Sequence, residues 1–110
     1  MFQTTKFISN QTSIFKIVQK DLYKDDFAVF LIKQVKHYNL SNVILDISLF
    51  EVISHRDIQL IEKIIHVFKL NNIRSIVCGI NPYSAGLIPH FSDTISFQVT
   101  LGIKEALDAF

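Results

Sequence analysis

The sequence is poor in the residues that build disulfides and phosphate-binding loops. It has one cysteine, Cys78, and three glycines among its 110 residues. A lone cysteine cannot form an internal disulfide, and a reducing compartment is the simplest setting for such a chain. The glycines at 79, 86 and 102 are spaced too far apart for a P-loop or a dinucleotide-binding fingerprint. The sequence therefore predicts no bound nucleotide and no other cofactor.

Excess charge and long apolar runs are also scarce. The formal net charge is +1 at pH 7, which leaves no strong positive field to attract a nucleic acid. The longest apolar run, Phe27–Ile32, is far too short to span a bilayer. Lys6 interrupts the N-terminus before the hydrophobic region of a signal peptide could form. We expect a cytoplasmic protein that does not insert into a membrane.

Apolar residues, in contrast, make up 49% of the chain, enough for the core of a single domain over residues 1–110. Strand-like and helix-like segments alternate, which predicts an α/β fold with a mixed, mainly parallel sheet, an N-terminal hairpin and about four helices. The predicted hairpin strands are Phe2–Ile8 and Ser13–Val18, and the later strands are Val43–Ile47, Ser75–Ile80 and Thr94–Gln98. The predicted helices begin near Asp26, His55, Pro82 and Leu101, and we expect the last of them to pack Ile103 and Leu107 on the sheet.

The helix predicted from His55 to Leu70 has the clearest pattern. Its apolar residues recur at helical spacing, and we expect a buried stripe of Ile58, Ile61, Ile65 and Phe68, widened by Leu60 and Ile64. Ser54 precedes the helix and Asp57 follows three residues later, which is a variant of the N-capping box. The pattern thus predicts a helix that begins at a well-defined residue.

Three short motifs occur in a characteristic order. Asp46-Ile47-Ser48 ends the first buried strand, Gly79-Ile80-Asn81-Pro82 follows the second with Ala85 downstream, and Glu105-Ala106-Leu107 lies in the last helix. Together they resemble the anti-sigma-factor antagonist (STAS) domains, which are small bacterial signalling proteins. The resemblance implies a non-enzymatic protein that regulates transcription by binding a kinase-like anti-sigma factor, a switch kinase or other STAS proteins. It also allows a homo-oligomer.

The phosphorylated position of that family is altered here. Aligned from Asp46, the family's phosphorylated hydroxyl falls on His55, and the preceding acidic residue falls on Ser54. A second phosphorylated position of some relatives falls near Leu87, which has no hydroxyl. Ser54 is the remaining candidate for phosphorylation, because a phosphate there would lie at the positive end of a helix. A helix-capping role explains the same serine without any signalling.

The resemblance places partner binding around the start of the second long helix. The expected contact residues are Phe50, Glu51, Ser54, His55, Arg56 and Asp57, with Phe50 contributing to an exposed apolar patch. An alternative function is an accessory subunit, the STAS component of a bacterial lipid-transport ATPase complex. Binding of a small molecule is a third.

Asp46 offers an alternative of another kind, because receiver domains carry a phospho-acceptor aspartate at the end of a buried strand. That reading also requires two acids after the first parallel strand and a lysine after a late strand. The acids Asp25 and Asp26 lie too far along the chain, and Asn81 stands where the lysine would be. We therefore expect Asp46 to accept hydrogen bonds from the loop that follows it.

The sequence contains no catalytic constellation that we can argue. The four histidines, at 37, 55, 66 and 90, lack metal-ligand spacing, and adjacent Ser54 and His55 point in different directions at a helix start. Cys78 lies in an apolar strand, where thiols are usually inert. We predict no catalytic residues and no metal ligands.

Overall fold

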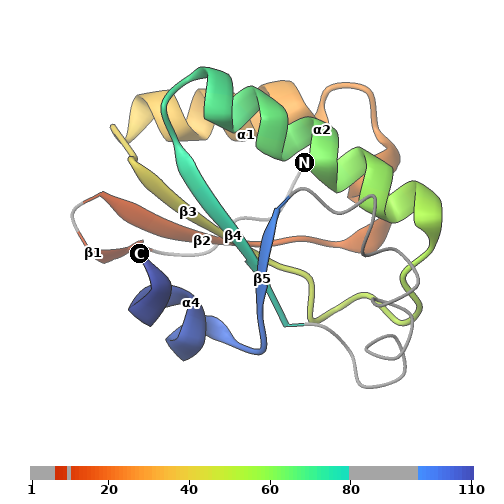
Figure 1. Ribbon diagram of the computed structural model, residues 1–110. Coiled ribbons are helices and arrows are strands. Elements are labelled where there is room, and N and C mark those ends of the chain that lie inside the picture. Colours follow the sequence, from red (N-terminus) through yellow and green to blue (C-terminus); the bar gives the residue numbers. More distant parts are fainter. Residues whose placement is uncertain (1–6, 10, 80–96) are drawn as a thin grey trace.

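One mixed sheet organises the chain in the computed structural model, which describes residues 7–9, 11–79 and 97–110 (Figure 1). Its strands follow one another in sequence order from β1 to β5. β1 pairs with β2 antiparallel, and all later pairs are parallel. The predicted α/β fold, with an N-terminal hairpin on a mainly parallel sheet, is confirmed. The strands are β1 (Phe7–Ser9), β2 (Thr12–Lys16), β3 (Asn42–Asp46), β4 (Arg74–Cys78) and β5 (Gln98–Thr100).

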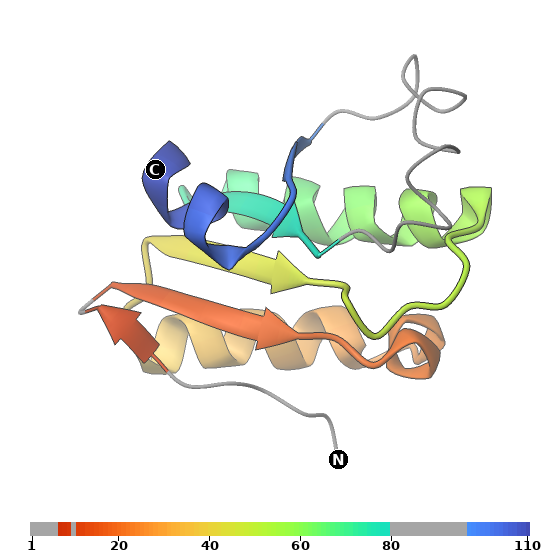
Figure 2. The same cartoon turned by 90° about the horizontal axis from the view of Figure 1, so that it is seen from below.

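The helices lie on both faces of this sheet. α1 (Phe27–His37) and α2 (His55–Leu70) cover one face, and α4 (Ile103–Ala109) lies against the other (Figures 1 and 2). A 3₁₀ helix, η1 (Gln19–Tyr23), precedes α1 and was not predicted. Figure 2 shows η1 beside the loop that leads into α2. The helix predicted from Pro82 lies outside the described residues.

The main core fills the space between the sheet and the α1–α2 layer. Side chains from both helices and from alternate strand positions meet there, among them Leu31, Val43, Leu45, Ile61 and Phe68. The opposite face carries a smaller cluster of Ile44, Ile76, Cys78 and Ala106. Burial on both faces explains why β3 and β4 read as continuous apolar runs.

The buried stripe of α2 is turned slightly from the predicted one. Ile58, Ile61 and Phe68 are buried as predicted, and so is Ile64, with 4% of its surface exposed. Ile65 packs against the same core but is only partly buried. Because η1 packs beside α2, the side of the helix that carries Asp57 and Ile64 is covered as well. Two adjacent isoleucines fit the same periodicity, and only this unpredicted neighbour decides between them.

The final helix also contacts the sheet differently than expected. We expected Ile103 and Leu107 to pack on the sheet. Ile103 is exposed instead, and Ala106 is the fully buried residue, with Leu107 packed beside it. The helix begins at Ile103 rather than Leu101, with Gly102 at its N-cap, which turns Ile103 away from the sheet.

Candidate functional site

The candidate site begins where β3 ends and the chain turns towards α2. Asp46 is buried, and its Oδ1 accepts a hydrogen bond of 2.9 Å from the backbone N–H of Ser48. The N–H of Ile47 donates to the carbonyl of Cys78 at 2.9 Å, which joins this turn to the end of β4. Asp46 therefore accepts a hydrogen bond from the following loop, as predicted, and shapes the path of the chain.

Gly79 allows the backbone after β4 to lie close to the turn that follows β3. Its φ is +82°, in the left-handed region that favours glycine. A Cβ atom at this position would lie 2.5 Å from Oδ1 of Asp46 and 3.0 Å from Cβ of Ser48. The first residue of the Gly79-containing motif is thus required by contact with the Asp46-Ile47-Ser48 motif. The remainder of that motif lies outside the described residues.

The start of α2 is a complete capping box. Oγ of Ser54 accepts a hydrogen bond of 3.1 Å from the N–H of Asp57, and Oδ2 of Asp57 accepts one of 2.9 Å from the N–H of Ser54. The predicted capping role of Ser54 is confirmed, and α2 begins at His55 as expected. Satisfying two backbone donors in this way fixes the direction in which the helix leaves the loop.

Asp57 does more than close the box. It is buried, with 1% of its surface exposed, and its carboxylate accepts hydrogen bonds from two residues of η1. Nε2 of Gln19 donates to Oδ2 at 2.9 Å and also to the carbonyl of Val52 at 2.9 Å. The hydroxyl of Tyr23 donates to Oδ1. A single carboxylate therefore holds η1, the loop before α2 and the first turn of α2 together.

The residues predicted to contact a partner divide into exposed and buried groups. Glu51, Ser54, His55 and Arg56 are exposed. Phe50 and Asp57 each have only 1% of their surface exposed. The expectation of an exposed apolar patch at Phe50 is wrong, because Phe50 belongs to the main core.

Two other apolar residues of the same loop face solvent. Leu49 is 48% exposed and Val52 is 62% exposed, and neither was predicted as a contact residue. Phe50 and Ile53 point into the core while their neighbours point outward. Residues 49–53 are all apolar or acidic and have no regular repeat, so the sequence could not show which of their side chains point into the core.

Arg56 occupies a position of α2 at which a positive charge lowers the stability of the helix. It is the second residue of α2, where the helix dipole disfavours a cation by about 0.3–1 kcal/mol. Its guanidinium lies 5.8 Å from the centre of the Tyr23 ring, within the range of a cation–π contact. This contact links Arg56 to η1 and keeps the charge at the surface beside the start of the helix.

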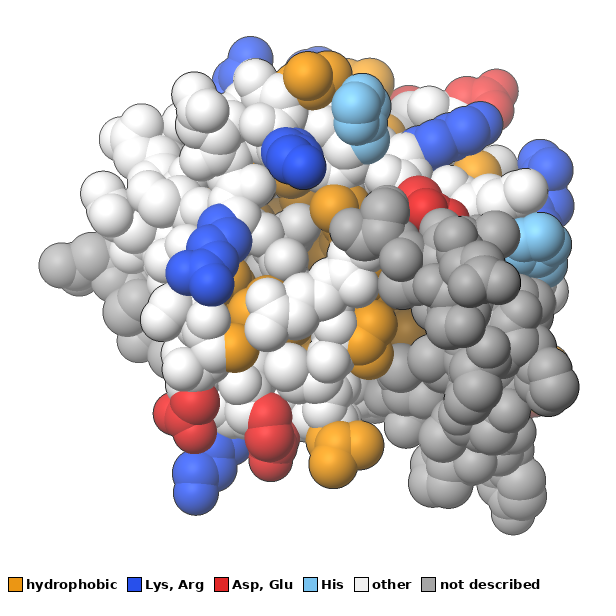
Figure 3. Space-filling view, in the orientation of Figure 1, with side chains coloured by type: hydrophobic (Ala, Val, Ile, Leu, Met, Phe, Trp, Pro, Cys, Tyr) orange, Lys and Arg blue, Asp and Glu red, His pale blue; other side chains and the backbone are white. Residues whose placement is uncertain are grey.

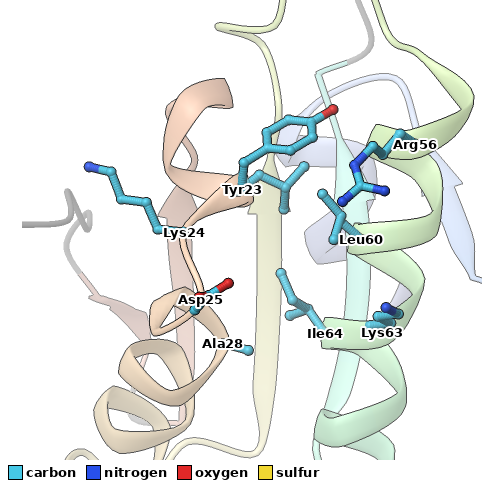
Figure 4. A pocket seen from close by; sticks show the side chains of 9 residues that line it. Tyr23, Lys24, Asp25, Ala28, Arg56, Leu60, Lys63 and Ile64 are labelled. Carbon is cyan, nitrogen blue, oxygen red and sulfur yellow. The ribbon is translucent and has the colours of Figure 1, made fainter.

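A groove separates η1 and the start of α1 from α2. Its volume is about 290 Å³. We call it the η1–α2 groove; its lining residues are Leu22, Tyr23, Lys24, Asp25, Ala28, Arg56, Leu60, Lys63 and Ile64. In Figure 4, Tyr23 and Arg56 extend towards each other across it, Leu60 and Ile64 project from α2, and Lys24 points away from α2.

Elsewhere, charge is dispersed. On the face drawn in Figure 3, basic and acidic side chains are scattered over the described surface, without one broad field of either sign. Within the described ranges, no three His, Cys, Asp or Glu side chains are placed to hold a metal ion. No helix among the described residues is long and apolar enough to cross a membrane.

Cys78 lies at the end of β4 and is buried. Burial raises the pKa of its thiol to about 12, with smaller contributions from the negative charges of Asp46 and Glu105. A thiol with so high a pKa stays protonated at neutral pH, so it is a poor nucleophile.

Solved structures resemble this chain over most of its length. One is a variant of RsbS from Moorella thermoacetica, with a TM-score of 0.70 and 17% sequence identity, covering 92% of this chain and 88% of that one. The chain has the STAS fold. A second match comes from the stressosome, described as a signal integration and transduction hub, with a TM-score of 0.64 and 16% identity, covering 94% of this chain and 92% of that one. No protein-family model and no curated protein matches the sequence.

Among the described residues of the three motifs, Asp46-Ile47-Ser48 lies at the end of β3, Gly79 directly follows β4, and Glu105-Ala106-Leu107 lies within α4. At these low identities the likeness establishes the fold alone. What the start of α2 does in this chain has to be argued from its own residues.

Proposed function

We propose that this protein is a regulatory interaction domain of the anti-sigma-factor-antagonist type, which works by binding another protein and not by catalysis. The partner would be a kinase-like anti-sigma factor or another STAS domain in a signalling assembly. The observation that carries the proposal is an exposed set of varied side chains on a rigidly held helix start. The fold it shares with RsbS and with a stressosome component supports the same class of function.

The proposed contact surface surrounds the first turn of α2. We call it the α2-start surface and define it by Leu49, Glu51, Val52, Ser54, His55 and Arg56, all of them exposed. It combines apolar side chains, an acid, a base and an imidazole, which is the mixture that protein interfaces use. Asp57 and Phe50 lie beneath this surface and support it. They affect partner binding only through the residues that they position.

We further propose that binding does not depend on phosphorylation. Ser54 Oγ already accepts the N–H of Asp57, and the buried carboxylate of Asp57 bonds the N–H of the same serine. A phosphate of about −2 charges on Ser54 would lie beside this carboxylate and be repelled by it. The family's aligned position carries His55, which has no hydroxyl.

The alternatives are less well supported. Neither RsbS nor the stressosome is described as a transporter component, so the lipid-transport alternative gains nothing from the comparisons. Small-molecule binding would need an enclosed site, and the η1–α2 groove lies open at the surface (Figure 4). Protein binding at the α2-start surface remains the function that the exposed residues support best.

The test is an affinity capture from the native cells with variants on and off this surface. Val52→Asp and His55→Glu should each reduce capture of the partner at least about tenfold, because interface centres tolerate such changes poorly. His66→Glu, an exposed position later on α2, is the matched control and should leave capture unchanged. A GHKL-fold kinase or a STAS protein as the captured partner supports the proposal. Equal capture by all the variants would refute the proposed surface.

A further inference from the structure

The η1–α2 groove adjoins the α2-start surface, because Arg56 belongs to both. Its apolar lining comes from three elements: Leu22 of η1, Ala28 of α1, and Leu60 and Ile64 of α2. Its volume of about 290 Å³ falls at the lower end of the range for ligand pockets, about 300–1,000 Å³. A groove of this size and openness suits a few side chains of a bound segment better than an enclosed cofactor.

Charges are distributed unequally between its two walls. The α2 wall carries Arg56 and Lys63, whereas the α1 side carries Asp25. Lys24 also lies on the rim, but its Nζ lies 2.8 Å from Oδ1 of Asp21, and it points away from α2 in Figure 4. In the part of the chain that the structure describes, neither Arg56 nor Lys63 forms a salt bridge. The α2 wall therefore presents two positive charges beside an apolar floor.

The position of Arg56 supports a binding role for this wall. A cation at the second residue of a helix is disfavoured by the helix dipole, so helix stability does not explain the arginine. Its contact with the Tyr23 ring directs the guanidinium to the mouth of the groove. Because Arg56 belongs to the α2-start surface as well, a partner bound there could continue into the groove without a break.

We propose that the η1–α2 groove binds an acidic segment of the partner protein, with an apolar side chain seated on Leu60 and Ile64 and a carboxylate held by Arg56 and Lys63. This inference rests on the proposed function and names the chemistry of the partner. Asp25 on the opposite wall gives the site an orientation, because it repels an acidic group from the α1 side and directs it towards α2.

The probe is a synthetic peptide, acetyl-Glu-Leu-Glu-Glu-Leu-amide, titrated into the ¹⁵N-labelled full chain and followed by NMR. We expect saturable shifts at the amides of Arg56, Leu60 and Lys63. Arg56→Gln and Lys63→Gln should each weaken binding by about two- to fivefold, as for single surface ion pairs. Asp25→Asn should strengthen it by a similar factor. A peptide with glutamine in place of each glutamate should bind more weakly than the acidic one.

Lys33→Gln is the matched control, since it removes one positive charge from an exposed position of α1 outside the groove. It should leave the peptide affinity unchanged. Shifts that fall elsewhere, an affinity lowered as much by Lys33→Gln as by Lys63→Gln, or no gain from Asp25→Asn would overturn the proposal. If the peptide fails while Val52→Asp still abolishes partner capture, the groove inference falls and the proposed function stands. If the peptide binds as expected but no partner depends on the α2-start surface, the proposed function falls instead.

Discussion

Replacement of Asp57 is the strongest test of how the binding surface is supported. Three donors from outside its own side chain bond the carboxylate: the Tyr23 hydroxyl, Nε2 of Gln19 and the N–H of Ser54. Hydrogen bonds to charged groups each contribute about 1.5–3 kcal/mol. The three are not additive, because Gln19 and Tyr23 lie near solvent and can bond water once the acid is gone. We expect Asp57→Ala to lower the free energy of unfolding by about 3–5 kcal/mol.

Asp57→Asn separates the charge from the shape. The amide keeps the volume and one acceptor oxygen, but its NH₂ group cannot accept the bonds that the second carboxylate oxygen accepts. The loss should be smaller, about 1.5–3 kcal/mol. Urea denaturation followed by circular dichroism measures both. Asp25→Asn, an exposed acid before α1, is the matched control and should change stability by less than about 0.5 kcal/mol. A loss below about 1 kcal/mol in Asp57→Ala would refute the argument that this acid holds the site together.

The same bond has a signature at high pH. The hydrogen bond to Asp57, together with burial, raises the pKa of the Tyr23 phenol above its ordinary value of 10.0. The folded protein therefore holds this proton more tightly than the unfolded chain, and the stabilisation is complete below about pH 10. It is lost as the pH rises through the folded-state pKa. We expect the stability of the wild type to fall more steeply above that pH than the stability of Tyr23→Phe, and equal slopes would contradict the bond.

Three further predictions concern the helix start, the core and the thiol. Ser54→Ala should lower the free energy of unfolding by about 1 kcal/mol through loss of the cap, whereas Ser54→Asp should keep the stability. Mass spectrometry of the natively purified protein should find Ser54 without phosphate. A substantial phosphorylated fraction that has lost partner binding would restore a phosphorylation switch. Ile64→Ala should cost about 2–5 kcal/mol in urea denaturation and Ile65→Ala clearly less, and the reverse order would contradict the observed face of α2. The folded protein should react with iodoacetamide at Cys78 far more slowly than the urea-unfolded chain does at pH 8, since burial keeps the thiol protonated; equal rates would show that the thiol is accessible.

Local patterns were enough to predict much of the fold. The apolar runs of β3 and β4 and the periodicity of α2 each depend on neighbouring residues, so their type was predicted correctly. The capping box was readable for the same reason, because Ser54 and Asp57 are three residues apart. α2 ends at Leu70, as predicted, and Asn72, two residues later, has a φ of +60°, the left-handed conformation common after a helix end.

The 3₁₀ helix η1 could not be predicted in this way. Its five residues, Gln19–Tyr23, contain one buried apolar side chain, Leu22, and no helical repeat. What holds η1 in place is Asp57, which is 38 residues from Gln19 and 34 from Tyr23. Contacts over that separation have no local signal. The groove depends on η1, so it was missed with it.

The outward and inward residues of the loop before α2 were misassigned for a related reason. Leu49, Phe50 and Val52 are all apolar, and the loop has no regular repeat that sorts them. Phe50 faces inward and packs in the core between the sheet and the helices. Which of the loop's apolar residues enters that core depends on the assembled layers and cannot be read from the order of residues.

The close approach of Gly79 to Asp46 and Ser48 has a consequence for how this protein can change over evolutionary time. Any side chain at position 79 would collide with the turn that leads to α2, so these three positions can vary only together. Glu51, His55 and Arg56, a few residues along the same loop and helix, are exposed. A descendant of this chain could therefore acquire a different partner by substitutions at the surface, while the turn beneath it stays under strong selection against change.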